Sequence, residues 1–191
     1  LDERLSGLLT NLRSSDDFTG KALTSLTVHS PRGIKAKRLL LIGLGEQATA
    51  SRRSFHDAAA AALRIITARK FDRVALVLPK VGAVSMENTV LAVGAGAVQG
   101  SFGPGVRQTE PNRFPPQEIV LYAPTNSKKT VLKESLHRAQ IESEALTLAR
   151  SLVNSPPCDL YPESFAAQIA DTARQIDIDC DIWDERRLAA E

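Results

Sequence analysis

Short aliphatic runs alternate with alanine- and glycine-rich stretches of helical periodicity in the first two thirds of the chain. The runs span residues 39–44, 74–78 and 118–122, and each has the length of one β-strand. The run Leu39-Leu40-Leu41-Ile42 is dense enough to predict a strand covered on both faces. Strands that alternate with helices predict an α/β sandwich with a mixed or mostly parallel sheet.

The periodic stretches predict where helices begin and end. Leucines at helical spacing predict a first helix over residues 1–13, and alternation predicts a half-buried strand over 23–29. Ser51 or Ser54 is expected to cap a helix that ends near Arg69. Ser85 is expected to cap a helix to about Ser101, whose glycines suit close approach of a neighbouring element: Gly94, Gly96 and Gly100. The order of elements is then α-β-β-α-β-α-β.

The last third of the chain has a different pattern. A long helix is predicted over residues 133–153, and its apolar residues form one stripe: Leu136, Ile141, Ala145, Leu148 and Leu152. Pro162 suits the first turn of the next helix, whose inward residues would be Phe165, Ile169, Ala173 and Ile176. Alternation predicts a strand over 178–183, and Asp184 is expected to cap a final helical turn.

The polar stretch 124–129 marks a candidate domain boundary. We therefore expect an N-terminal α/β domain over residues 1–125 and a connector helix over 126–155. Residues 156–191 would be the opening α-β unit of another domain. The chain begins at Leu1 and stops within a charged, helix-like stretch, which suggests a piece of a longer protein.

Charge and cysteine content exclude several classes of protein. The 24 basic and 22 acidic residues leave a formal net charge of +2, so neither nucleic acid nor a membrane surface is expected as a partner. No apolar run approaches the roughly 20 residues that span a bilayer. The two cysteines, Cys158 and Cys180, favour free thiols in a reducing cytoplasm over a disulfide scaffold.

Motifs for catalysis and metal binding are absent from the sequence. The three histidines, His29, His56 and His137, lie far apart, and neither Cys158 nor Cys180 has a neighbouring cysteine at ligand spacing. The alternating aspartates Asp177, Asp179, Asp181 and Asp184 are typical of the solvated face of a strand. We predict no catalytic, cofactor-binding or metal-ligating residue in this chain.

One glycine-containing turn deserves comparison with phosphate-binding loops. Gly43-Leu44-Gly45 follows a predicted buried strand, where open α/β folds bind ligands. The third glycine of the dinucleotide fingerprint is missing, because Ala48 occupies its position. Turn formation explains these glycines without a ligand, although nucleotide binding stays open as an alternative.

Several segments resemble the leucyl (cytosol) aminopeptidase family. Residues 35–45 resemble the strand and turn of its N-terminal domain, and the alanine-rich stretch 58–62 matches the helix that follows. The stretch 148–157, Leu-Ala-Arg-Ser-Leu-Val-Asn-Ser-Pro-Pro, is similar to a family segment that leads into a helix beginning with Thr-Pro-Glu. Here Tyr161 replaces the threonine, which removes an N-cap hydroxyl. The stretch 182–185 resembles the strand and turn before the catalytic core.

The resemblance implies a parent enzyme that is a metal-dependent aminopeptidase, a hydrolase acting on the N-termini of peptides. Such an enzyme uses two divalent ions, Mn or Zn, and is usually a cytoplasmic hexamer. Its N-terminal domain is a macrodomain-like three-layer α/β sandwich, here lacking its first strand. No catalytic residue of the family maps onto this chain, because the Asn-Thr-Asp-Ala-Glu-Gly-Arg-Leu signature is missing. The chain would then be an inactive assembly or regulatory region whose partner is the missing catalytic domain.

Two alternative functions stay open at this stage. A macrodomain-like fold with the Gly43-Leu44-Gly45 turn would suit a module that binds ADP-ribose or a related nucleotide. Some aminopeptidases of this family are thought to bind DNA, and the basic pair Arg52-Arg53 motivates that alternative here.

Overall fold

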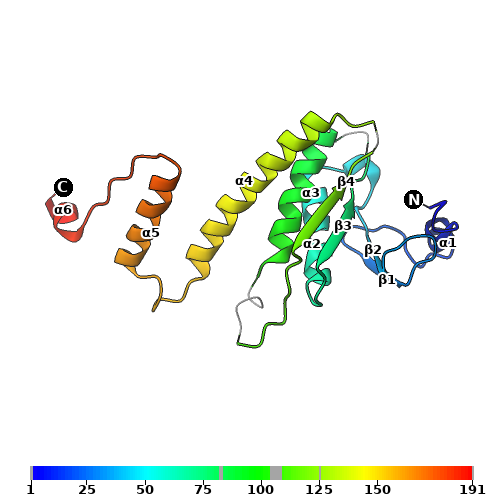
Figure 1. Cartoon of the computed structure of the whole chain (residues 1–191), viewed down its shortest axis with the longest axis horizontal. Coiled ribbons are helices and arrows are strands. Elements are labelled where there is room, and N and C mark those ends of the chain that lie inside the picture. The colour runs from blue at the N-terminus through cyan, green and yellow to red at the C-terminus, as the bar shows by residue number, and fades with distance from the viewer. Residues whose placement is uncertain (1, 82–83, 104–108, 125, 191) are drawn as a thin grey trace. The chain divides into compact units, whose positions relative to one another are not determined.

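The computed structural model describes residues 2–81, 84–103, 109–124 and 126–190 (Figure 1). It divides into two compact units, Leu1–Glu144 and Ala145–Glu191, and each is described by itself below. The larger unit contains elements in the predicted order: α1 (Leu8–Ser14), β1 (Ser25–His29), β2 (Arg38–Ile42), η1 (Gln47–Thr49), α2 (Arg52–Ile66), β3 (Arg73–Val77), α3 (Met86–Ser101), β4 (Glu118–Tyr122) and the first part of α4 (Lys129–Asn154). The smaller unit contains the end of α4, α5 (Pro162–Gln175) and α6 (Glu185–Ala190).

The strands pair in both directions, which confirms the mixed α/β class. Antiparallel pairing joins β1 to β2, with Ser25 opposite Ile42. Parallel pairing joins β3 to β4, with Arg73 opposite Glu118 and Val77 opposite Tyr122. Among the described residues these are two separate two-stranded sheets. All five residues of β2 are half-buried, so the expectation of a strand fully covered on both faces is not met.

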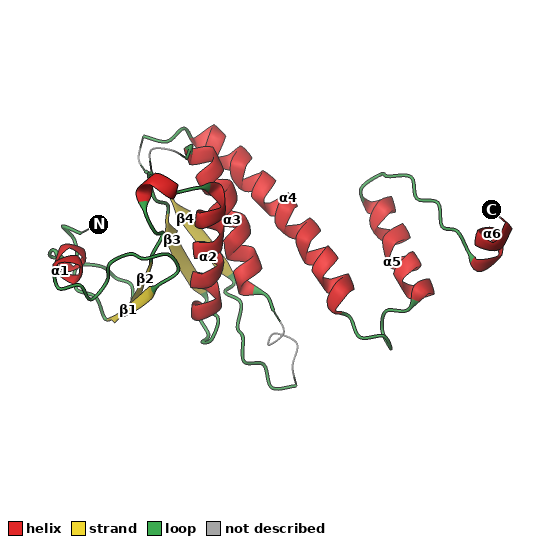
Figure 2. Ribbon diagram, turned by 180° about the vertical axis from the view of Figure 1, so that it is seen from behind, coloured by secondary structure: helices red, strands yellow, loops and turns green. Residues whose placement is uncertain are grey.

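Helices α2 and α3 lie side by side against the β3–β4 sheet (Figure 2). Their contact is made by backbone, because α3 carries glycine where the two helices meet. A Cβ atom on Gly96 would lie 2.2 Å from the carbonyl oxygen of His56, and one on Gly100 would lie 2.3 Å from that of Ala60. Real Cβ atoms do not approach so closely, so these glycines permit the close approach that the sequence predicts.

Small side chains on α2 complete this interface. Ala58, Ala59, Ala60 and Ala62 are buried, and Leu63 is fully buried among them. One core cluster forms around Phe55 with the buried residues Ala59, Leu78, Val90, Ala92 and Val93. A second cluster of Ala62, Leu63 and Ala97 receives side chains from three strands: Leu40, Ile42, Leu76 and Ile119. The helix pair therefore buries one face of each sheet.

Helix α3 also packs against α4, and the residues that α4 buries lie outside its apolar stripe. The residues of α4 that are buried are Ser135, Ala139 and Ser143, whereas Leu136 and Ile141 are 39% and 53% exposed. A Cβ atom on Gly94 would lie 3.0 Å from that of Ala139, so the two helices approach too closely for larger residues at the contact. The buried hydroxyls of Ser135 and Ser143 donate to the carbonyl oxygens of Val131 and Ala139, four residues earlier.

The first helix is shorter than predicted, because residues 2–7 form turns instead. Ser6 and Gly7 have φ values of 54° and 75°, in the left-handed region that ends a right-handed helix. The carboxylate of Asp2 accepts hydrogen bonds from the amides of Leu9 and Thr10, at 2.7 and 3.3 Å. Asp2 thus satisfies amides at the start of α1 from outside the helix.

The smaller unit confirms two predicted helix starts but not the predicted strand. Pro162 occupies the first turn of α5, and Asp184 accepts a hydrogen bond from the amide of Arg187 at the start of α6. Residues 178–184 have no regular structure, because no strand in the described chain pairs with them. Instead the indole of Trp183 donates to Asp181 at 2.9 Å, and Arg187 also reaches Asp181.

Replacing Gly96 or Gly100 with alanine should destabilise the larger unit. Alanine favours a helix over glycine by up to about 1 kcal/mol, but here its methyl group would force the two helices apart. We expect each substitution to lower the free energy of unfolding by about 2 kcal/mol, since overpacking typically costs about 1–3 kcal/mol. Urea denaturation followed by far-ultraviolet circular dichroism measures this change.

Gly103→Ala is the matched control, because among the described residues a Cβ atom there would meet nothing closer than the Arg113 side chain, at 3.9 Å. Its effect should stay within about 0.5 kcal/mol. If Gly96→Ala were as stable as Gly103→Ala, the backbone contact between α2 and α3 would not be a packing constraint.

Candidate functional site

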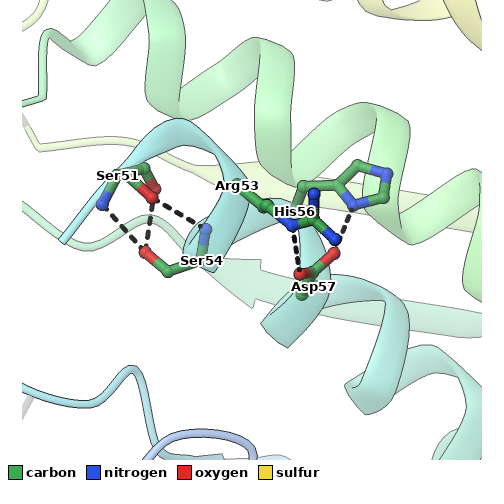
Figure 3. A network of polar contacts seen from close by, with 5 residues as sticks. All are labelled: Ser51, Arg53, Ser54, His56 and Asp57. Atoms are coloured by element: carbon green, nitrogen blue, oxygen red, sulfur yellow. Dashed lines mark hydrogen bonds and ion pairs between the residues drawn. The ribbon is translucent and has the colours of Figure 1, made fainter. Parts of the chain in front are cut away.

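A polar cluster lies in the first two turns of α2 (Figure 3). The side chain of Ser51 accepts a hydrogen bond from the amide of Ser54 at 3.3 Å, and the side chain of Ser54 accepts one from the amide of Ser51 at 2.9 Å. This reciprocal pair is a capping box, so both predicted capping serines take part. Their hydroxyls are occupied in starting the helix.

The next turn carries the imidazole and carboxylate of this cluster. His56 Nδ1 lies 3.0 Å from Asp57 Oδ1, and Arg53 Nε lies 3.5 Å from Asp57 Oδ2. The hydrogen bond with His56, followed by the positive charge of Arg53, lowers the pKa of Asp57 below its usual value. An imidazole oriented by a carboxylate is one part of a nucleophilic site. The two serines beside this pair, Ser51 and Ser54, bond to each other's backbone, so neither is hydrogen-bonded to His56 as a nucleophile would be.

The acidic and histidine residues do not come together as a metal site. The described residues contain no group of three or more His, Cys, Asp or Glu side chains that could hold a metal ion. Asp181 and Asp184 instead bond to Trp183 and Arg187. The residues present therefore do not fit the pair of divalent ions that the resemblance implies, and no catalytic step is assigned to them.

The glycine turn after β2 is packed against a neighbouring loop. The amide of Gly43 donates to the carbonyl of Thr24 at 2.8 Å, and that of Gly45 donates to Gly20 at 3.0 Å. A Cβ atom on Gly43 would lie 1.9 Å from the carbonyl oxygen of Lys21. Phosphate-binding loops present free amides to the ligand. Both glycine amides are already used here, so the turn serves packing between β2 and residues 20–24.

The basic residues considered for DNA binding are paired within the protein. Arg52 forms an ion pair with Glu142 of α4 at 2.8 Å, and Arg53 pairs with Asp57. Arg38 lies over the ring of Phe71 at 5.4 Å from its centre. The charges of Arg52 and Arg53 are thus partly balanced by carboxylates of the protein itself. Cys158 and Cys180 are free and exposed, as expected from the sequence.

One positively charged hollow was not predicted from the sequence. It has a volume of about 330 Å³ and lies where α2 ends, lined by Arg64, Ala68, Asn112 and Arg113. The lining residues come from two segments that are far apart in the chain, so no local motif could have revealed it. Among the described residues, neither arginine forms an ion pair.

Within the described ranges, none of the helices has both the length and the apolar character needed to cross a bilayer.

Comparison with known proteins places these features in a family context. The family model "Cytosol aminopeptidase family, N-terminal domain" matches residues 1–104. Probable cytosol aminopeptidases from Acidobacterium capsulatum and Corynebacterium diphtheriae are 26% and 32% identical over 187 residues. These alignments cover 98% of this chain but only 37% and 35% of the relatives. The chain therefore spans about a third of the length of the curated relatives it matches.

Solved structures show the same fold. A tomato leucine aminopeptidase mutant superposes with a TM-score of 0.78 at 24% identity, covering 99% of this chain and 37% of that one. The bottromycin maturation enzyme BotP, in complex with Mn, gives a TM-score of 0.74 at 24% identity, covering 94% of this chain and 36% of that one. At these identities the likeness concerns the arrangement of the chain.

Replacing Asp57 with asparagine should change the pH dependence of stability. The pKa of Asp57 is lowered in the folded state, so its stabilising effect is present above the unfolded value, near 3.8, and is lost as the pH falls through the lower folded value. The side chain is 43% exposed, so the effect at neutral pH should be below about 1 kcal/mol. Urea denaturation from neutral to strongly acidic pH should show wild type and Asp57→Asn converging in acid.

Asp72→Asn serves as the control, because Asp72 is exposed and its carboxylate forms no ion pair within the described chain. Its stability should follow wild type at every pH. A constant difference between Asp57→Asn and wild type down to strongly acidic pH would contradict the assigned cause.

Proposed function

The chain belongs to the cytosol aminopeptidase family through its N-terminal domain, and on that premise we propose that it is the non-catalytic N-terminal region of a metal-dependent aminopeptidase. The parent enzyme would remove N-terminal amino acids from peptides in the cytoplasm. The match over residues 1–104 carries this proposal, because it covers more than half of the chain and names one family. The aminopeptidase relatives and the leucine aminopeptidase fold support it.

Exposed apolar side chains in the smaller unit suggest where the rest of the enzyme packs. In α5 and the segment after it, Phe165, Ile176 and Ile178 are 45%, 60% and 59% exposed. We call the following set the C-terminal apolar surface: Val153, Phe165, Ile176, Ile178, Ile182, Trp183 and Leu188. Where exposed apolar side chains gather into a patch, they usually mark a contact with another protein segment. Because the relatives are nearly three times longer, the proposed occupant is the continuation of the same polypeptide.

This proposal gives each region of the chain a role. Residues 1–125 would form the N-terminal domain, 126–155 the connector, and 156–191 the start of the catalytic domain. Two divalent ions, Mn or Zn, would supply a metal-activated water and polarise the peptide carbonyl. The Mn complex of BotP supports this choice of metal, and the donors are expected in the continuing polypeptide, since the described residues offer no such group.

The larger unit is proposed to serve assembly of a homo-oligomer, such as a hexamer. The outward face of the β3–β4 sheet carries Val77 and Tyr122, which are 63% and 59% exposed and lie opposite each other in register. A cross-strand pair of Arg73 with Glu118 forms the other end of this face. A second copy that covers Val77 and Tyr122 would remove apolar surface from water. Nucleotide or DNA binding has no comparable support, because the Gly43 and Gly45 amides and both Arg52 and Arg53 are engaged within the protein.

The purified 191-residue chain should not hydrolyse a leucine anilide, even with added Mn²⁺. The same gene product extended to the length of the relatives should hydrolyse it, because the metal donors are expected in the added region. Release of the aniline product measures the rate. Activity of the short chain would refute the proposal that it is non-catalytic, and inactivity of the metal-loaded long chain would refute the proposed aminopeptidase parent.

Replacing residues of the C-terminal apolar surface should matter only in the longer polypeptide. Phe165→Ser and Ile176→Ser should change the stability of the 191-residue chain by less than about 0.5 kcal/mol, because both side chains are already exposed. In the extended polypeptide each should lower the free energy of unfolding by about 2 kcal/mol, the amount expected for a buried apolar side chain. Chemical denaturation of both lengths measures the difference.

Gln168→Ser on α5 is the control, because Gln168 is exposed and polar. It should leave both lengths unchanged. Equal, small effects of Phe165→Ser in the two lengths would show that the continuing polypeptide does not cover this surface.

A further inference from the structure

The hollow at the end of α2 has the chemistry of a phosphate site. Two arginines, Arg64 and Arg113, line it together with Asn112. Guanidinium groups bind oxyanions through paired N–H donors. Two like charges that line one hollow disfavour each other, and an anion bound between the two arginines would offset this. Within the described residues, no carboxylate forms an ion pair with either one.

Local contacts hold the two sides of the hollow together. The amide of Phe114 donates to the carbonyl oxygen of Thr67 at 2.8 Å, which joins the segment carrying Arg113 to the end of α2. Thr67 is fully buried, so this junction is shielded from solvent. Lys70 lies over the ring of Phe114, 5.0 Å from its centre, and adds a third positive charge nearby. The position of Arg113 therefore depends on contacts within the fold.

The helix dipole opposes an anion at this place, since the C-terminal end of a helix carries partial negative charge. Several of the last carbonyls, however, already accept hydrogen bonds. The amides of Thr67, Ala68 and Arg69 donate to the carbonyls of Leu63, Ile65 and Ile66. The positive charge of Arg64 interacts favourably with the helix dipole, because Arg64 lies in the last turn of α2. The dipole does not explain why Arg113 and Asn112 lie at the same place, because they belong to another segment.

We propose that this hollow binds a phosphate group, either inorganic phosphate or the phosphate of a small monoester. A phosphate near neutral pH carries about −1.5 to −2 charges, which matches two guanidinium groups better than the single charge of a carboxylate. The volume of about 330 Å³ lies at the lower end of the range for small-molecule sites, which is about 300–1,000 Å³. The site lies outside the proposed peptidase chemistry and does not depend on it.

Titration of the 191-residue chain with inorganic phosphate, at constant ionic strength, tests the proposal. Amide NMR spectra should show saturable shifts confined to residues near 64–68 and 112–114, with a Kd of about 1 mM. Absence of saturable shifts at up to about ten times that concentration would overturn it. Adenosine monophosphate forms the second arm: tighter binding than phosphate identifies a monoester site, and equal or weaker binding identifies a site for inorganic phosphate.

Variants connect binding to the named residues. Arg64→Gln and Arg113→Gln should each weaken phosphate binding at least about fivefold, because each removes a charge-assisted pair of donors. Arg113→Lys keeps the charge but loses the paired donors, so an intermediate affinity is expected. Arg13→Gln on α1 is the matched control for loss of one exposed positive charge, and it should leave affinity unchanged. If Arg13→Gln weakened binding as much as Arg113→Gln, general charge attraction would explain the result and the site would be rejected.

Discussion

Backbone contact between α2 and α3 determines how the larger unit is built. Glycine at positions 96 and 100 lets α3 approach the carbonyls of His56 and Ala60, and the alanines of α2 leave no side chain in the way. The helix pair then presents one continuous apolar surface to the strands, on which Leu40, Leu76 and Ile119 pack. The opposite side of α3 makes a similarly close contact, between Gly94 and Ala139 of α4. Most of α3 is consequently buried, as expected for a helix that is apolar on every side.

Features set by neighbouring residues could be predicted from the sequence, whereas features set by distant contacts could not. Ser51, Ser85, Pro162 and Asp184 begin helices as predicted, because capping depends on residues within one turn. The buried side of α4 could not be predicted from its apolar stripe, since side-chain size there is set by the glycine on α3. The strand predicted over 178–183 failed because alternation supplies a strand pattern but no pairing partner. The hollow at Arg64 and Arg113 was missed for the same reason, since it exists only when two remote segments meet.

The candidate sites taken from sequence patterns turn out to have structural uses. The hydroxyls of Ser51 and Ser54 cap the N-terminus of α2. The carboxylate of Asp57 contacts His56 and Arg53. The amide of Gly43 donates a hydrogen bond to the preceding loop. These polar groups already have partners within the fold. The two arginines of the hollow differ from these groups because their charges are not balanced by a described carboxylate.

The C-terminal apolar surface also has a consequence for biosynthesis. Ribosomes add about 5–20 residues per second, and the proposed continuation is longer than the chain described here, so its synthesis takes on the order of tens of seconds. During that interval Phe165, Ile176 and Trp183 would face solvent on a nascent chain whose covering segment has not yet been made. A chaperone that binds exposed apolar segments would bind the nascent chain during this interval. Folding of the parent enzyme would then be limited by the order in which the ribosome delivers its parts.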